Sequence, residues 1–245
     1  MIIVKNILKI ILRPIFFRVH TRKRGKLLEL KFWEKLASGR SGKWNKEYTR
    51  RLDPDSEVSG HHRQILDHHY SSGMKILDVG SGPLSGIGHC YNGNRLSIYA
   101  CDPNAEEYNL QLDKHGITPP VQTMYARGEN LSGDIKGKYD WINCDNALDH
   151  TSNPNKVITE MQKVLRPGGI ISLLHVIDEG LKEGYRGYHK WNIRPDGTNA
   201  FVIWNPKKSY KYVQEHLGLQ TAVETTGKHV LIIMKDVKGH HDSLN

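Results

Sequence analysis

The chain has 245 residues, of which 38% are apolar and 25% are charged, and its formal net charge is +9. This composition is that of one full-sized globular domain, and it excludes a fibrous or low-complexity chain. Three cysteines, none of them in a C-x-x-C pair, argue against a disulfide framework and a zinc knuckle. They favour a reducing, cytoplasmic compartment.

The positive charge is concentrated at the N-terminus. Residues 1–51 hold 15 Lys or Arg and 3 Asp or Glu, whereas residues 52–245 hold 20 and 23. The main body of the chain is therefore slightly acidic, which argues against a nucleic-acid partner for it. RNA binding through the basic N-terminal segment stays open as an alternative.

Residues 1–26 form a basic amphipathic segment. Lys5, Lys9 and Arg13 share one narrow stripe of a helix over residues 1–13, and Pro14 ends or kinks that helix. The segment is too short and too charged to span a bilayer, and it lacks a secretory cleavage site. We expect either peripheral contact with the inner face of the cytoplasmic membrane or packing on the protein itself or a second subunit. No motif specifies an oligomeric state.

Residues 27–72 read as a helical extension, which includes a helix within residues 57–72. That helix carries four histidines, of which His61 and His68 share one face and His62 and His69 another. A metal site would need carboxylate or cysteine partners, and none stands nearby in the sequence. The sequence therefore predicts a solvated helix here.

The stretch MKILDVGSGP, residues 74–83, joins a buried strand to a glycine loop. Met74 to Val79 is apolar and β-branched, and Asp78 lies at the carboxyl end, where open α/β sheets bind ligands. No Gly-Lys-Ser/Thr follows, which excludes a P-loop. A G-x-G-x-x-G dinucleotide fingerprint is incomplete, because Ser85 stands at its third glycine position.

Further strands follow in the order expected of an α/β sheet. One ends at Cys101, and Asp102 stands twenty residues past Gly82, the separation that brings an acid to a ribose edge. Another covers residues 141–144, before a helix with Asn153 as N-cap and Pro154 at its first position. The remaining predicted elements are helices over 85–94, 105–115 and 209–217, and strands over 121–125, 170–176, 219–225 and 229–235.

These motifs together resemble the class I S-adenosylmethionine (SAM) dependent methyltransferases, in the type 11 or ubiquinone-type subgroup. The glycine loop is similar to motif I, D/E-x-G-x-G-x-G, although Leu84 replaces its last glycine. The stretches NALDHTSNP and VLRPGG resemble the family's turns after strand four and before strand five. The resemblance implies an α/β, Rossmann-like fold with a seven-stranded, mostly parallel sheet ordered 3-2-1-4-5-7-6 and helices on both faces.

The resemblance also implies a division of the chain and a cofactor, SAM. Residues 27–72 would serve as a lid, residues 73–238 would form the SAM-binding domain with an acceptor-binding insertion at 177–206, and residues 239–245 a flexible tail. Ala126 to Gly128 replace the family's Gly-Asp-Ala, so a side-chain contact with adenine is not expected from an aspartate. The cofactor residues implied are Asp78, Gly80, Ser81, Gly82, Pro83, Asp102, Pro103, Arg127, Gly128, Glu129, Asp145 and Asn146.

Methyl transfer from a sulfonium needs in-line positioning and, for a hydroxyl acceptor, a general base. His150 and His189 are the two candidates, and each has the alternative of a purely structural role. Asp145 and Asp149 suggest a divalent metal, but a third ligand is not identifiable, so no metal is expected. We expect O-methylation of a small-molecule, glycan or lipid-linked acceptor; the alternatives are a quinone-type C-methyltransferase, an RNA methyltransferase or a catalytically silent SAM-binding partner.

Overall fold

The computed structural model describes residues 22–40, 45–197, 199–212, 215–216 and 218–237. Most of the predicted amphipathic segment 1–26 and the whole of the tail 239–245 lie outside these residues. Among the described residues, no helix has the length and apolar character needed to cross a membrane.

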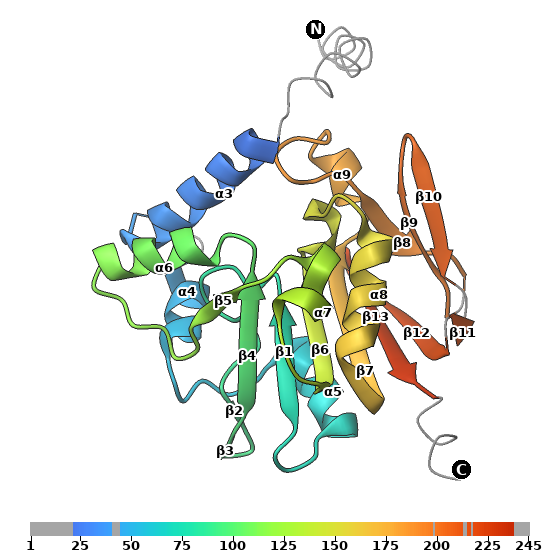
Figure 1. Cartoon of the computed structure of the whole chain (residues 1–245), viewed down its shortest axis with the longest axis horizontal. Helices are drawn as coiled ribbons and strands as arrows, with labels where there is room; N and C mark the ends of the chain where they lie inside the picture. The colour runs from blue at the N-terminus through green and yellow to red at the C-terminus, as the bar shows by residue number, and fades with distance from the viewer. Residues whose placement is uncertain (1–21, 41–44, 198, 213–214, 217, 238–245) are drawn as a thin grey trace, which may run out of the picture.

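One eight-stranded sheet forms the centre of the molecule (Figure 1). Its order is β11-β12-β13-β7-β6-β1-β4-β5. The neighbours from β7 to β5 are parallel, whereas β13 and β12 run antiparallel to theirs. The strands are β1 (Lys75–Val79), β4 (Ser97–Asp102), β5 (Thr123–Tyr125), β6 (Tyr139–Asp145), β7 (Leu165–Val176), β11 (Glu215–His216), β12 (Leu219–Thr226) and β13 (His229–Asp236). The predicted order is confirmed, and β11 is an additional edge strand.

The two faces of the sheet are covered by different helices, and alternation along β1 shows how. Leu77 packs in the cluster that contains Val157 of α8 (Pro154–Val164), whereas Ile76 packs with Ile65 of α5 (Gly60–His69). Because successive side chains of a strand point to opposite faces, α8 and α5 lie on opposite sides of the sheet. The central strands are therefore buried on both faces.

The helix α8 begins where the sequence predicts. Asn153 is the N-cap, its side-chain oxygen accepts a hydrogen bond from the Lys156 N–H at 3.1 Å, and Pro154 occupies the first turn. The strand after it starts already at Leu165 rather than Ile170, and its pairing with β6 is irregular between Tyr139 and Trp141. The turn residues 167–169 thus lie within β7.

The predicted helix over residues 85–94 is wrong. The segment forms turns and a hairpin of β2 (Cys90–Tyr91) and β3 (Asn94–Arg95). Gly88 has a φ of +99°, and a Cβ there would lie 3.0 Å from the Val58 backbone, so the chain approaches its neighbour too closely for a helix with side chains. The amides of His89 and Cys90 donate to the Ser56 carbonyl instead.

The predicted helix over residues 209–217 is also wrong. A second sheet, β10-β9-β8, occupies this region, with β8 (Asn192–Pro195), β9 (Phe201–Asn205) and β10 (Lys208–Tyr212). Asn205 accepts hydrogen bonds from the amides of Lys207 and Lys208, which closes the hairpin, and Tyr212 stacks on Phe201 with ring centroids 4.5 Å apart. Burial of Tyr212, and in part of Tyr210, in the main core cluster outweighs the local helical pattern.

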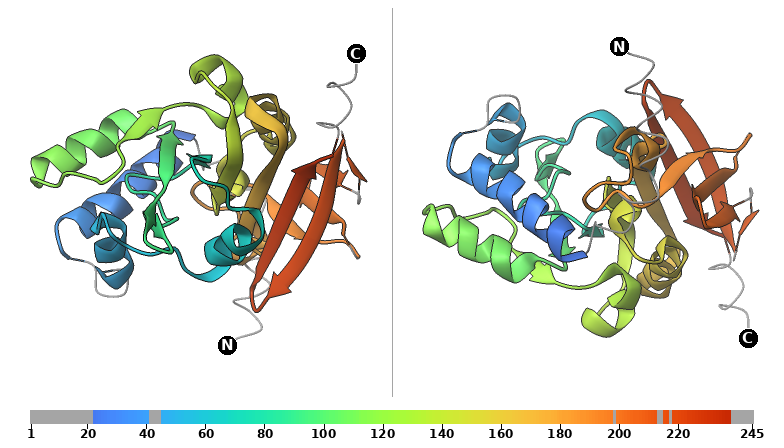
Figure 2. Two further views of the ribbon diagram at one scale, coloured as in Figure 1. Left: turned by 90° about the horizontal axis from the view of Figure 1, so that it is seen from below. Right: turned by 90° about the horizontal axis from the view of Figure 1, so that it is seen from above.

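The N-terminal extension is helical and lies beside the sheet. Helix α3 (Arg22–Ala37) crosses the boundary predicted between residues 26 and 27, and α4 (Asn45–Leu52) follows it. All three views show α3 next to α6 (Ala105–Lys114) (Figures 1 and 2). Between these helices the rings of Trp33 and Tyr108 meet edge to face. The remaining helices are short: α7 (Leu131–Asp134), α9 (Glu179–Lys182) and the 3-10 turns η1 (Gly128–Asn130) and η2 (Leu148–His150).

Candidate active site

A cavity of about 1100 Å³ lies over the carboxyl ends of β1, β4, β5 and β6. One side of the cavity, here called the sheet side, is formed by residues that follow the strands, within 78–82, 102–104, 125–129 and 143–152. The opposite side, here called the covering side, is formed by residues of α3, α4, the start of α5 and the segment 179–190. Every predicted site residue lines it except Pro83. Single small-molecule pockets occupy about 300–1,000 Å³, so this cavity has room for a cofactor and an acceptor together.

The glycine turn after β1 is fixed by close packing. Gly80 and Gly82 have φ values of +74° and +66°, in the region that favours glycine. A Cβ on Gly80 would lie 2.4 Å from Cβ of Ala147, and one on Gly82 would lie 2.8 Å from the Trp33 ring. Helix α3 therefore packs directly on the turn, a contact that the sequence reasoning missed.

Asp78 ties this turn to the neighbouring strand. One carboxylate oxygen accepts a hydrogen bond from Ser85 Oγ at 2.7 Å, and the other accepts one from Asn143 Nδ2 at 3.0 Å. Burial raises the pKa of this carboxyl, against the effect of both hydrogen bonds. These two hydrogen bonds tie the end of β1 to Ser85 and to β6.

Asp102 lies at the end of β4 beside the turn. Its Oδ1 accepts from the Asn104 amide at 2.8 Å and its Oδ2 from the Gly82 amide at 3.3 Å. Burial raises the pKa of Asp102 to about 7. Each carboxylate oxygen can accept a second hydrogen bond, so the residue can serve a pair of hydroxyl groups in the cavity.

The loop after β5 is held by its own side chains. Arg127 pairs with Asp134 at 3.0 Å, and Glu129 accepts hydrogen bonds from the amide and the hydroxyl of Ser152, both at 2.7 Å. Gly128 lies against Val157. Arg127 and Glu129 thus line the cavity while their charged groups bind other residues of the protein.

Arg50 of α4 is a cavity residue that the sequence reasoning missed. Its Nη2 donates to the Gly86 carbonyl and to Glu47, both at 2.7 Å. Its Nη1 is buried and has no hydrogen-bond partner among the described residues. An unpaired guanidinium N–H in a cavity is suited to a carboxylate on a ligand. No sequence signal singled out this arginine from the basic residues around it.

His150 and His189 come together although they lie far apart in the chain. His150 Nε2 is 3.3 Å from His189 Nδ1, which is itself 2.8 Å from Oδ2 of Asp149, a buried residue of η2. Burial is the largest single effect and lowers the pKa of His189, but the hydrogen bond to Asp149 and the charges of Asp149, Glu179 and Glu183 together outweigh it, so the pKa is raised. The pKa of Asp149 is lowered, because the surrounding histidines outweigh its burial.

The insertion 177–206 contributes only part of its aromatic residues to the cavity. Glu179, Tyr188, His189 and Lys190 line it. Trp191 donates from Nε1 to the Thr151 carbonyl at 3.0 Å, and Trp204 donates to Asp178 at 3.3 Å. The Trp191 bond ties the insertion to the loop after β6, whereas the Trp204 bond joins two parts of the insertion itself.

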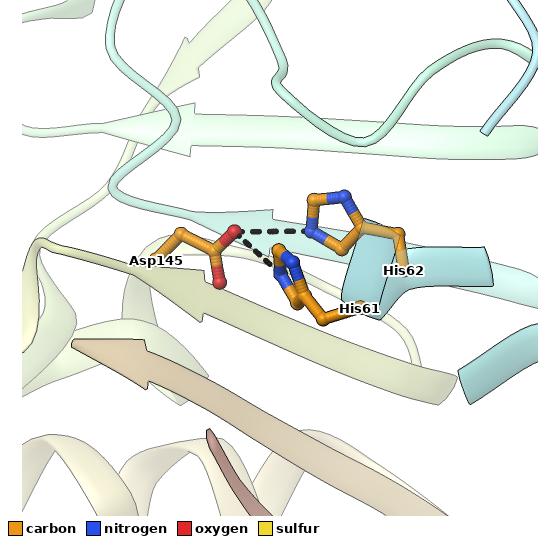
Figure 3. A group of neighbouring side chains, drawn as sticks. All are labelled: His61, His62 and Asp145. Carbon is orange, nitrogen blue, oxygen red and sulfur yellow. Dashed lines mark hydrogen bonds and ion pairs between the residues drawn. The ribbon is translucent and has the colours of Figure 1, made fainter. Parts of the chain in front are cut away.

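A second histidine cluster corrects the prediction for residues 57–72. His61 Nε2 and His62 Nε2 lie 2.9 and 3.0 Å from Oδ2 of Asp145, at the end of β6 (Figure 3). His62 is buried, so this part of α5 is not a solvated face. The missing carboxylate comes from a residue more than eighty positions away, which is why no local pattern revealed it. The other predicted residue of this loop, Asn146, accepts from the Val176 amide and has a φ of +47°.

The fold and the site define a class of protein. A parallel sheet with the order found here, a glycine turn after its first strand and an acid after the second are the features of a class I methyltransferase domain. Residues 77–173 match the family model described as a methyltransferase domain. This part of the chain is therefore a methyltransferase domain of the SAM-dependent type.

Known proteins with similar sequences carry related names. The ubiquinone/menaquinone biosynthesis C-methyltransferase of Idiomarina loihiensis is 27% identical over 161 residues, which cover 62% of each chain. The ubiquinone biosynthesis O-methyltransferase of Chromobacterium violaceum is 23% identical over 73% of this chain and 78% of its own. A solved SAM dependent methyltransferase from Aquifex aeolicus is 18% identical, with a TM-score of 0.46 over 83% of this chain and 98% of that one.

The cavity fits the cofactor that the family implies. SAM carries a ribose, an adenine and an amino acid end with a carboxylate. Asp102 offers acceptor oxygens for the ribose, Gly128 a backbone contact for the adenine, and the unpaired Nη1 of Arg50 a donor for the carboxylate. The hydrogen-bonding groups of the cavity therefore match the three polar parts of SAM.

Proposed function

We propose that this protein transfers a methyl group from SAM to an oxygen atom of a small-molecule, glycan or lipid-linked acceptor. The observation that carries the proposal is the hydrogen-bonded pair of Asp149 and His189 in the same cavity as the glycine turn. SAM, when bound, supplies a methyl group activated by a positively charged sulfur. The residues of the chain then have to orient both reactants, exclude water and remove a proton.

His189 is the residue best suited to remove the proton. Asp149 accepts from its Nδ1, which fixes the tautomer that leaves the Nε2 lone pair free for a hydroxyl proton. The hydrogen bond also stabilises the imidazolium formed after proton transfer. His150, 3.3 Å away, lies where it can orient the acceptor. A positioned base of this kind contributes about 10²- to 10⁴-fold to a rate.

The covering side supplies the acceptor surface in this proposal. Tyr188 faces His150 with ring centroids 5.5 Å apart, and the Lys190 ammonium lies 5.7 Å from the Tyr188 ring centre. An aromatic face beside a cation is suited to a flat or ring-shaped acceptor with polar substituents.

Quinone-type C-methylation is the second candidate, because a relative named for it is similar over 62% of this chain. In that case the base would remove a ring proton after methyl transfer. The site of the new methyl group in the product separates the two candidates: an O-methyl ether supports the first, and a C-methyl product supports the second.

Titration calorimetry tests the cofactor half of the proposal. SAM and, separately, NAD are titrated into the purified chain, with Asp102→Ala as the variant. We expect micromolar binding of SAM that Asp102→Ala weakens, and no binding of NAD. Failure of the folded wild-type protein to bind SAM would overturn the proposal, and SAM binding without turnover in any acceptor pool would favour a silent partner protein.

We also propose peripheral contact with the inner face of the cytoplasmic membrane through residues 1–26. Most of this segment lies outside the described residues, but Leu27, Leu28 and Phe32 of the adjoining helix α3 are exposed by 51%, 49% and 37%. Apolar side chains beside a basic segment suit an anionic interface. Co-sedimentation with phosphatidylglycerol vesicles should disappear on deletion of residues 1–21. If the full-length chain bound RNA but did not bind the vesicles, this proposal would be contradicted.

A further inference from the structure

His61, His62 and Asp145 converge on one point at the edge of the cavity. The two histidines stand in the first turn of α5, and Asp145 ends β6, so two separate elements meet there (Figure 3). Their ligand atoms all lie within 4.8 Å of one another, and both Nε2 atoms lie about 3 Å from the same carboxylate oxygen. All three residues line the cavity.

Hydrogen bonding alone leaves this cluster incomplete. His61 forms a hydrogen bond with Asp145 Oδ2 at 2.9 Å. His62 Nε2 meets Oδ2 at 3.0 Å as an ion pair without hydrogen-bond geometry, and Oδ1 has no hydrogen-bond partner among the described residues. The His62 side chain is 94% buried, since its exposed fraction is 6%. Buried polar atoms without hydrogen bonds are costly, and each of these two is a good metal ligand.

We infer that His61, His62 and Asp145 bind a divalent transition-metal ion, for which Zn²⁺ is the probe. Bonds of about 2.0–2.2 Å from such an ion to three ligand atoms place those atoms roughly 3.0–3.5 Å apart, and the two Nε2 atoms lie 2.9 and 3.0 Å from Asp145 Oδ2. Two imidazoles and one carboxylate are the donor set of zinc sites that keep an open coordination position.

The cluster Asp149, His150 and His189 is less suited to an ion, although its ligand atoms also lie close together. There the Nδ1 of His189 is committed to a hydrogen bond with Asp149. The open position at the first cluster faces the cavity. An acceptor oxygen bound there would lose its proton more easily, a role that rests on the proposed methyl transfer, whereas ion binding itself does not.

The test measures ion binding without SAM or acceptor, so its result is independent of methyl transfer. The full-length chain is stripped with a chelator, dialysed against Zn²⁺ and assayed for bound metal, and the affinity is measured by competition with a chromophoric chelator. We expect one equivalent. His61→Ala and the isosteric Asp145→Asn should lower the affinity by more than about 100-fold, beyond the 10- to 100-fold typical of residues behind the ligands.

His68→Ala is the matched control, because it removes a histidine from the same helix outside the cluster. This variant and His189→Ala should bind zinc as the wild type does. Absence of bound zinc, or a loss in His189→Ala but not in His61→Ala, would overturn the inference. If no zinc binds, Asp145 serves only as a hydrogen-bond acceptor for the imidazole N–H groups.

A measurement on the wild-type chain avoids any folding defect of the variants. Zinc bound to Nε2 of His61 should protect that residue from acylation by diethylpyrocarbonate, whereas His68 should stay reactive. Equal reactivity of His61 with and without zinc would also overturn the inference. Binding should weaken as the pH falls, because protons compete with the ion for imidazole nitrogens.

Discussion

The sheet side and the covering side of the cavity are assembled in different ways. Gly80, Gly82 and Asp102 lie within one stretch from β1 to β4 and are held by hydrogen bonds of the Gly80 and Gly82 amides. The residues of the covering side, such as Trp33, Arg50 and His189, come from segments that are far apart in the chain. From this difference we propose separate roles: the sheet side binds the cofactor, and the contact between the two sides carries out proton transfer.

The largest expected effect is at that contact. Asp149→Asn should lower kcat by about 10²- to 10⁴-fold, because the amide no longer fixes the His189 tautomer or stabilises its charged form. The pKa of His189, now raised by Asp149, should fall, so the acidic limb of the pH–rate profile should move to lower pH. SAM affinity, measured by calorimetry, should stay the same. If SAM affinity fell as much as kcat does, cofactor binding and proton transfer would not be separate roles of the two sides.

The next effect concerns the glycine turn. Gly80→Ala should lower the free energy of unfolding by about 3 kcal/mol or more, since it adds a clash with Ala147 to the strain of a positive φ. Gly116→Ala is the control, because Gly116 has a φ of +65° with no atom within 4 Å of a new Cβ. It should lose only about 1–2 kcal/mol in denaturant titrations. Equal losses would mean that the packing against Ala147 is unimportant.

A smaller effect is expected from pH on SAM binding. Burial raises the pKa of Asp102 to about 7, and the ionised carboxylate is the better acceptor for ribose hydroxyls. Affinity should therefore be greatest above this pKa and fall as the pH drops through it. The dissociation constant should rise by about tenfold between pH 8 and pH 6 in calorimetry. Asp102→Asn should bind more weakly at both values and show a flat profile.

The smallest effect should come from the outer edge of the covering side. Lys26 of α3 pairs with Glu107 of α6, and both side chains are more than a third exposed. Glu107→Gln should change the free energy of unfolding by less than about 1 kcal/mol, because solvent screens the pair. SAM affinity should not change. A loss of SAM binding in this variant would show that the position of α3 controls the sheet side.

Much of the sheet side could be predicted from short stretches of sequence. The glycine turn, Asp102 and the cap of α8 depend on backbone geometry and on neighbours within a few residues, so the chain carries their signal locally. Two local predictions failed for the same reason. Residues 85–94 and 209–217 have weak helical patterns, and contacts with Val58 and Phe201 decide their structure.

The order of the strands could be expected from the sequence, because its strand, glycine-turn and acid motifs resemble those of the methyltransferase family and the resemblance implies that order. Only the tertiary structure decided which histidines share a carboxylate. His61 and His62 meet Asp145, and His189 meets Asp149, across long separations in the chain. Such pairs leave no local pattern, because they are formed by the packing of helices and loops over the sheet.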